Sequence, residues 1–110
     1  MKAFRFFLVA VFATVLVYTI MVGNNHGWNL FPLFFGDIAA MNWAGQFNLD
    51  FSFFLLFTGL WIAWRNKFNP LGLGLGLFTL VGGIPFVSTY LFILSYKTNS
   101  IKEILTGKNK

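Results

Sequence analysis

Three stretches of this chain are apolar for long enough to cross a lipid bilayer as helices. They cover residues 6–23, 47–64 and 71–96, and charged residues are almost absent from their interiors. A spanning helix needs roughly 20 apolar residues to cross about 30 Å of hydrocarbon. Only 10% of the 110 residues are charged, too few to cover the surface of a soluble domain. The sequence therefore predicts an all-α, small polytopic membrane protein, with residues 1–110 forming a single transmembrane domain of three spans.

The segment between the first two spans, about residues 32–44, is apolar but too short to cross the bilayer. Asp37 and Asn42 interrupt it, and Trp28 and Trp43 flank it as aromatic residues do at a membrane interface. We expect a short interfacial or re-entrant helix here. A fourth span is the alternative.

The two ends of the chain carry basic residues. Bulky Ile20, Met21 and Val22 leave no small-residue cleavage site after the first apolar run, which favours a retained helix over the alternative of a cleaved signal peptide. The basic tail, residues 97–110, is expected to include a short surface helix near residues 101–105.

The net charge of +5 comes from eight Lys and Arg at the chain ends and in one short loop. This placement is typical of the positive-inside rule and does not indicate nucleic-acid binding. Three spans put the termini on opposite sides and divide these residues four and four, whereas four spans divide them six and two. Residues 24–46 contain no Lys or Arg. We therefore expect a multi-pass protein of the cell's inner (cytoplasmic) membrane with a cytoplasmic N-terminus.

Asp50 is the sharpest functional candidate, because an acidic residue in a spanning helix is a functional-site hypothesis by default. Its expected place near the start of its span also suits a helix cap, an interfacial anchor or a packing partner. Asp37 and His26 lie on the same predicted side, so the three could form a small interfacial site, although solvated loop residues are the simpler interpretation. No catalytic or metal-binding pattern is present, and the absence of Cys excludes a cysteine-ligated metal.

Small residues mark the expected helix-packing faces. Gly72, Gly76 and Gly83 fall on one stripe of the third span, Gly59 lies on the second span, and Pro85 predicts a kink or break beside Gly82 and Gly83. The abundant aromatic residues, 16 Phe and 4 Trp, suit packing, or a pocket for a bound lipid, quinone or carotenoid.

The order of these features resembles a bacterial family of short multi-spanning membrane proteins classed as a domain of unknown function. The residues that carry the resemblance are Phe47-Asn48-Leu49-Asp50 and Gly82-Gly83-Ile84-Pro85, followed by Tyr90-Leu91-Phe92. The resemblance extends over most of residues 6–95, and it implies a fold class but no activity.

These features favour an accessory or structural subunit that packs against a larger membrane complex through the glycine face of the third span. Its partners would be membrane lipids and other membrane protein subunits. A homo-oligomeric carrier or channel for a small molecule or ion, using Asp50, is the alternative. A third hypothesis is an interfacial lipid-modifying enzyme using His26, Asp37 and Asp50, but the sequence favours a non-enzymatic role.

Overall fold

The computed structural model describes residues 1–109, and this part of the chain is helical without strands. The helices are α1 (Lys2–His26), α2 (Phe31–Ala40), α3 (Trp43–Arg65), α4 (Pro70–Lys97) and α5 (Ile101–Thr106). Three of them, α1, α3 and α4, are long and apolar enough to cross a membrane by length and composition. The predicted class, a small all-α protein with long apolar helices, is confirmed. Helix α2 has only 10 residues.

Side-chain caps determine where three of the helices begin. Asn42, Asn69 and Ser100 each accept a hydrogen bond from the backbone N–H three residues further on, at 2.7, 2.7 and 3.3 Å. Such caps satisfy N–H groups that have no partner within the helix. Because Asn42 caps α3, this helix begins at Trp43 rather than at the expected residue 47. Asp50 consequently lies about two turns inside α3 and not in its first turn.

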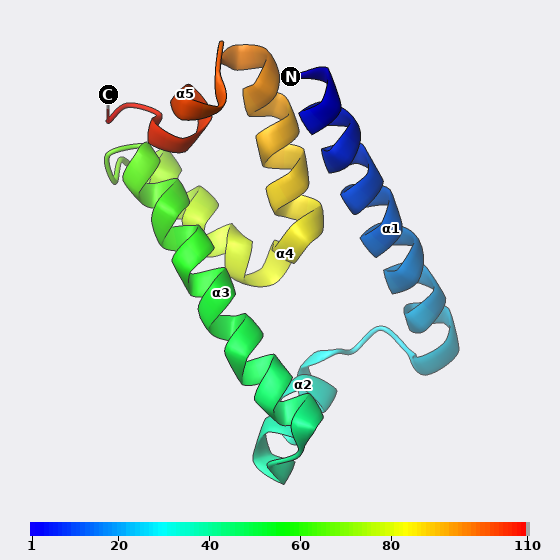
Figure 1. The fold of residues 1–110 in the computed structure, drawn as a ribbon. Coiled ribbons are helices and arrows are strands. Elements are labelled where there is room, and N and C mark those ends of the chain that lie inside the picture. Colours follow the sequence, from blue (N-terminus) through cyan, green and yellow to red (C-terminus); the bar gives the residue numbers. More distant parts are fainter. Residues whose placement is uncertain (110) are drawn as a thin grey trace.

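Helix α4 is broken in the middle and folds back on itself. Gly83 has φ 58° and ψ −146°, a conformation that side-chain-bearing residues rarely adopt. Pro85 follows within the same helix and removes one backbone donor. Figure 1 shows the chain descending as far as this break and then returning, so that α4 consists of two arms, residues 70–82 and 84–97. The kink predicted near Pro85 is present, but it is a reversal and not a bend.

Two hydrogen bonds between the second arm of α4 and the residues that end α3 confirm this reversal. The Tyr90 hydroxyl accepts hydrogen bonds from Arg65 Nη1 at 2.8 Å and from Asn66 Nδ2 at 3.2 Å. Arg65 ends α3 and Asn66 begins the short turn before α4, whereas Tyr90 lies in the second arm of α4. A straight helix would place Tyr90 about 30 Å from Pro70 at its start. The break at Gly83 removes that separation.

Helix α3 packs against α4 through glycine. A Cβ atom added to Gly76 would lie 2.6 Å from the Gly59 carbonyl oxygen, and a Cβ added to Gly59 would lie 2.6 Å from the Gly76 oxygen. The two backbones therefore touch directly, as small residues allow in membrane helices. A second close crossing joins α2 to α3, where Gly45 meets the Asp37 carbonyl, and Asn48 Nδ2 donates to the Phe34 oxygen at 3.2 Å.

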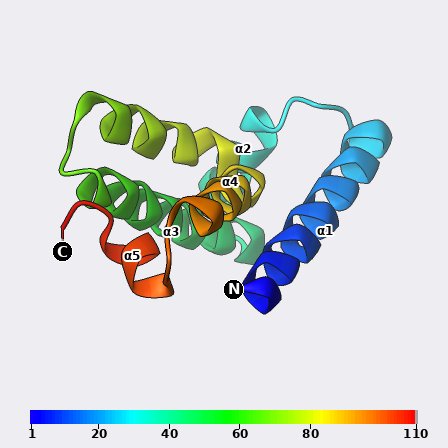
Figure 2. The same cartoon turned by 90° about the horizontal axis from the view of Figure 1, so that it is seen from above.

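Both described ends of the chain lie at the same end of the molecule. Figures 1 and 2 show the start of α1 beside the end of α4, with α5 across the end of α3. We call this the basic end, and we call the opposite end, with the end of α1, α2 and the start of α3, the far end. The expected placement of the termini on opposite sides assumed that the third apolar segment runs straight. Because the segment reverses at Gly83, the end of α4 lies beside the start of α1.

Candidate functional site

Arg65, at the basic end, is the one charged residue of the described chain that is buried. Arg65 is only 6% exposed. Its Nε donates to the Ile104 carbonyl oxygen at 2.7 Å, and its Nη1 donates to the Tyr90 hydroxyl at 2.8 Å. The guanidinium carbon also lies 5.7 Å from the centre of the Tyr90 ring. One side chain thus joins the end of α3 to the second arm of α4 and to α5.

Several further contacts attach α5 and the tail to the end of α3. The Trp61 indole N–H donates to the Leu105 oxygen at 2.9 Å, and the Lys108 N–H donates to the Arg65 oxygen at 2.8 Å. Ile104 is buried, with 1% of its surface exposed. Gly107 has φ 56°, and a Cβ there would collide with the Arg65 carbonyl. The predicted surface helix near residues 101–105 is therefore docked on α3.

A second arginine joins α1 to the second arm of α4. Arg5 Nε donates to the Ser95 hydroxyl at 2.9 Å, and Arg5 Nη2 donates to the Ser95 carbonyl at 2.7 Å. The same guanidinium lies 3.8 Å from the centre of the Tyr96 ring, a cation–π distance. The two arginines therefore hold the basic end together by hydrogen bonds to hydroxyl and carbonyl groups, with no carboxylate involved.

The three candidate residues from the sequence lie toward the far end. His26 is exposed at the end of α1, Asp37 is half-buried in α2, and Asp50 is exposed on α3. Within residues 1–109 no group of three His, Cys, Asp or Glu side chains is placed to hold a metal ion. His26 instead lines a groove with Tyr18 and Trp28 at the corner between α1 and α2.

The glycines expected on packing faces have different roles. Gly59, Gly72 and Gly76 are buried at the contact between α3 and α4 within this chain. Gly83 is the break in α4, and Pro85 stands beside it. The hydroxyl of Thr89 donates to the Pro85 oxygen at 2.8 Å, which fastens the start of the second arm. The glycine stripe is therefore occupied by α3.

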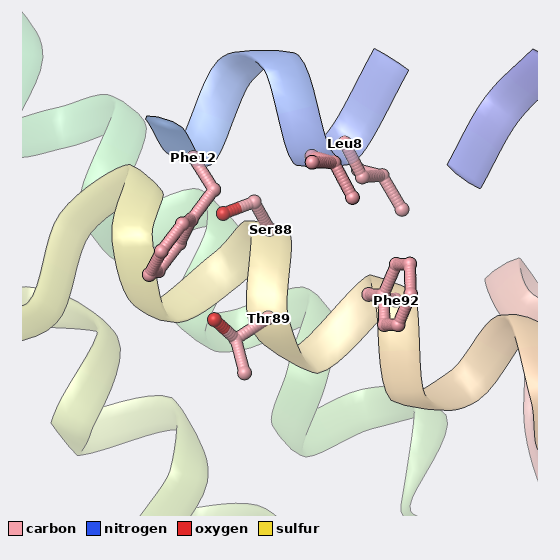
Figure 3. A pocket seen from close by; sticks show the side chains of 6 residues that line it. Leu8, Phe12, Ser88, Thr89 and Phe92 are labelled. Atoms are coloured by element: carbon pink, nitrogen blue, oxygen red, sulfur yellow. The ribbon is translucent and has the colours of Figure 1, made fainter. Parts of the chain in front are cut away.

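A shallow groove separates α1 from the second arm of α4 (Figure 3). Its lining is apolar apart from two hydroxyls; the residues are Leu8, Val9, Phe12, Ser88, Thr89 and Phe92. The groove measures about 150 Å³, less than the roughly 300–1,000 Å³ of pockets that enclose a drug-sized ligand.

The sequence did not indicate that Arg65 binds Tyr90 or that Arg5 binds the second arm of α4. Both arginines looked like ordinary interfacial cations, and their partners lie 25 and 90 positions away along the chain. One signal was present in the pattern: Arg65 stands directly after an unbroken apolar helix, where an arginine able to reach backbone carbonyls is favoured by the helix dipole.

Comparison of the chain with protein families, with curated proteins and with solved structures finds no match. The resemblance carried by residues 47–50, 82–85 and 90–92 stays a prediction.

Proposed function

We propose that this protein, a small integral membrane protein of the bacterial inner membrane, is an accessory subunit that packs against a larger membrane complex through α1. The observation that carries the proposal is the exposure of α1. Of its 25 residues only Leu8 and Gly23 are buried. Its packing partner in the chain is α4, and Figure 1 shows α1 at one side of the molecule, with α4 between it and α3.

The two faces of α1 differ in character. The face toward α4 carries the less exposed residues, with Leu8 buried and Val11 and Val15 half-buried. The opposite face carries three small side chains and one larger one, spaced three and four residues apart, and all four are exposed; they are Ala10, Ala13, Thr14 and the larger Val17. Small residues at this spacing let a second membrane helix approach closely. We call these four residues the α1 stripe.

We therefore assign the partner-binding surface to α1 and not to the glycine face of α4 that the sequence favoured. The glycine face of α4 is filled by Gly59 and its neighbours on α3, so a partner helix would have to displace α3 to reach it. The α1 stripe has no such competitor within the described chain. Partner subunits and lipid share the remaining apolar surface.

The test is the native mass of the protein extracted from its own membrane in a mild detergent. We expect it inside a particle much larger than its 12.5 kDa chain, and we expect Ala13→Leu to release it as a small species. Leu16→Phe is the matched control, because it also adds bulk to an exposed position of α1 but lies beside the stripe. A wild-type protein that emerges as a monomer or small homo-oligomer would contradict the subunit proposal.

A carrier or channel role is the second candidate, and the position of Asp50 favours it. Because α3 begins at Trp43, Asp50 lies about 10 Å along this helix from its start. An acidic residue this far inside a helix is better suited to line a proton or cation path than to cap the helix. Proteoliposomes with an enclosed pH-sensitive dye test it: the wild type should leak protons and Asp50→Asn should not. Equal leakage from both proteins would exclude Asp50 from any path.

A further inference from the structure

The two arms of α4 are too short to cross a bilayer separately. Residues 70–82 and 84–97 each form about 20 Å of helix, against the roughly 30 Å of a hydrocarbon core. The 25 residues of α1 and the 23 residues of α3 are long enough. The arms of α4 meet at Gly83, beside α3 on one side and α1 on the other (Figure 1). The start and the end of α4 both lie at the basic end.

The basic end collects every Lys and Arg of the described residues. They are Lys2, Arg5, Arg65, Lys67, Lys97, Lys102 and Lys108, and the five lysines are exposed. Contacts between distant parts of the chain place them together, because Arg5 binds Ser95 near the end of α4 and Arg65 binds Ile104 on α5. At the far end, residues 24–46 have no Lys or Arg.

Acidic groups do not neutralise these lysines. Glu103 is the single acidic residue of the tail, and its carboxylate accepts a hydrogen bond from the Asn99 N–H at 3.0 Å, across the cap of α5. Asp37 and Asp50 lie away from the basic end, on α2 and in the first half of α3. The described basic end therefore holds seven Lys and Arg against one carboxylate and keeps a net positive charge.

We propose that α4 is a re-entrant hairpin that enters and leaves the bilayer on the cytoplasmic side, and that the basic end binds anionic phospholipid headgroups of that leaflet. The chain then crosses the membrane twice, by α1 and α3, with both termini in the cytoplasm. A straight third span would divide the cations equally between the two sides, whereas the hairpin puts all of the described ones on one side. Such one-sidedness is what the positive-inside rule describes. The inference requires only that the protein is membrane-embedded, so it is independent of the subunit proposal.

The break in α4 is partly covered by the chain, with Gly82, Gly83 and Pro85 half-buried. Non-helical backbone is tolerated at membrane depth where protein covers it. Phe78 and Phe86, one from each arm, lie 4.9 Å apart between ring centres beside the break. The Thr89 and Ser88 hydroxyls donate to the Pro85 carbonyl at 2.8 and 3.3 Å.

Single-cysteine labelling tests the topology, and the natural chain has no cysteine to remove. Ala3→Cys, Asn99→Cys and Asn25→Cys introduce exposed thiols at the start of α1, after α4 and at the far end. With a membrane-impermeant maleimide, we expect the first two to react in inverted vesicles and Asn25→Cys in right-side-out vesicles. Reaction of Ala3→Cys and Asn99→Cys from opposite sides would overturn the hairpin. Reaction of both from the outside would overturn the cytoplasmic orientation.

Lipid retention tests the headgroup surface. The purified protein, equilibrated with equal phosphatidylglycerol and phosphatidylcholine, should retain phosphatidylglycerol preferentially in native mass spectrometry. A cationic residue near an anionic surface contributes about a fivefold preference, so Lys97→Gln with Lys102→Gln should lower the retention ratio about tenfold or more at low salt. Asn25→Gln, a neutral change at an exposed position of the far end, is the control and should leave the ratio unchanged. Equal retention of both lipids by the wild type would refute the headgroup surface.

Discussion

Replacing Gly76 by Ala places a methyl group where α3 and α4 touch. The added Cβ would lie 2.6 Å from the Gly59 carbonyl oxygen, whereas close C–H···O contacts in proteins lie at roughly 3.3–3.6 Å. The helices must therefore separate by somewhat less than 1 Å along much of their contact. Overpacking of this kind costs about 1–3 kcal/mol. The better helix propensity of alanine offsets about 0.5–1 kcal/mol of that cost.

Gly74→Ala is the matched control for this prediction. Gly74 lies on the same arm of α4, two residues earlier, and an added Cβ meets nothing within 4 Å. Gly74→Ala should therefore be neutral or stabilising by about 0.5–1 kcal/mol. The free energy of unfolding, measured by sodium dodecyl sulfate titration in mixed micelles, should differ between the two variants by about 1–3 kcal/mol.

The reciprocal contact at Gly59 gives a second check on the same reasoning. Gly59→Ala should destabilise to a similar degree, because its Cβ would lie 2.6 Å from the Gly76 oxygen. The double variant should cost less than the sum of the two single variants, since the first substitution already separates the helices. If Gly76→Ala proves as stable as Gly74→Ala, the direct backbone contact between α3 and α4 is refuted.

Three further predictions concern the basic end. Tyr90→Phe removes the hydroxyl that accepts hydrogen bonds from Arg65 and Asn66. Because two buried donors then lose their acceptor, the free energy of unfolding in the same titration should fall by about 1–3 kcal/mol. An unchanged value would mean that water replaces the hydroxyl. Gly107→Ala combines a φ of 56° with a clash against the Arg65 carbonyl, so we expect faster proteolysis of the tail than in wild type, and equal protection would contradict the docked geometry. Ile104→Ala truncates a side chain that is 1% exposed. It should lower the free energy of unfolding by about 2–4 kcal/mol if α5 unfolds together with the rest of the chain. Amide hydrogen exchange in α5 shows whether only this helix is destabilised.

Much of the secondary structure could be predicted from local patterns. Apolar runs predicted three long helices and a short one near residues 32–44, and the structure has α1, α3, α4 and α2 at those places. The helix near residues 101–105 was also expected, and α5 occupies Ile101–Thr106. The start of α3 was misjudged by four residues, since the cap at Asn42 has a weaker signal than the apolar run that follows it.

The candidate site was less predictable. The sequence drew attention to His26, Asp37 and Asp50, because ionisable groups in an apolar chain are rare. The polar network that the structure contains uses Arg65, Tyr90 and a backbone carbonyl of α5. A carbonyl acceptor has no sequence signal, since every residue carries one.

The sequence by itself determined the class of this protein and the approximate bounds of its helices. Scarce charge and long apolar runs require lipid cover, and a backbone in lipid must satisfy its hydrogen bonds within helices. The tertiary structure decided the path of the third apolar segment and the use of its glycines. A glycine followed closely by a proline permits a kink, a break or a full reversal, and the choice depends on contacts made elsewhere. Here Arg65 and Asn66 hold Tyr90 beside the start of α4, and this long-range contact, absent from any local pattern, selects the reversal that brings the basic residues to one end.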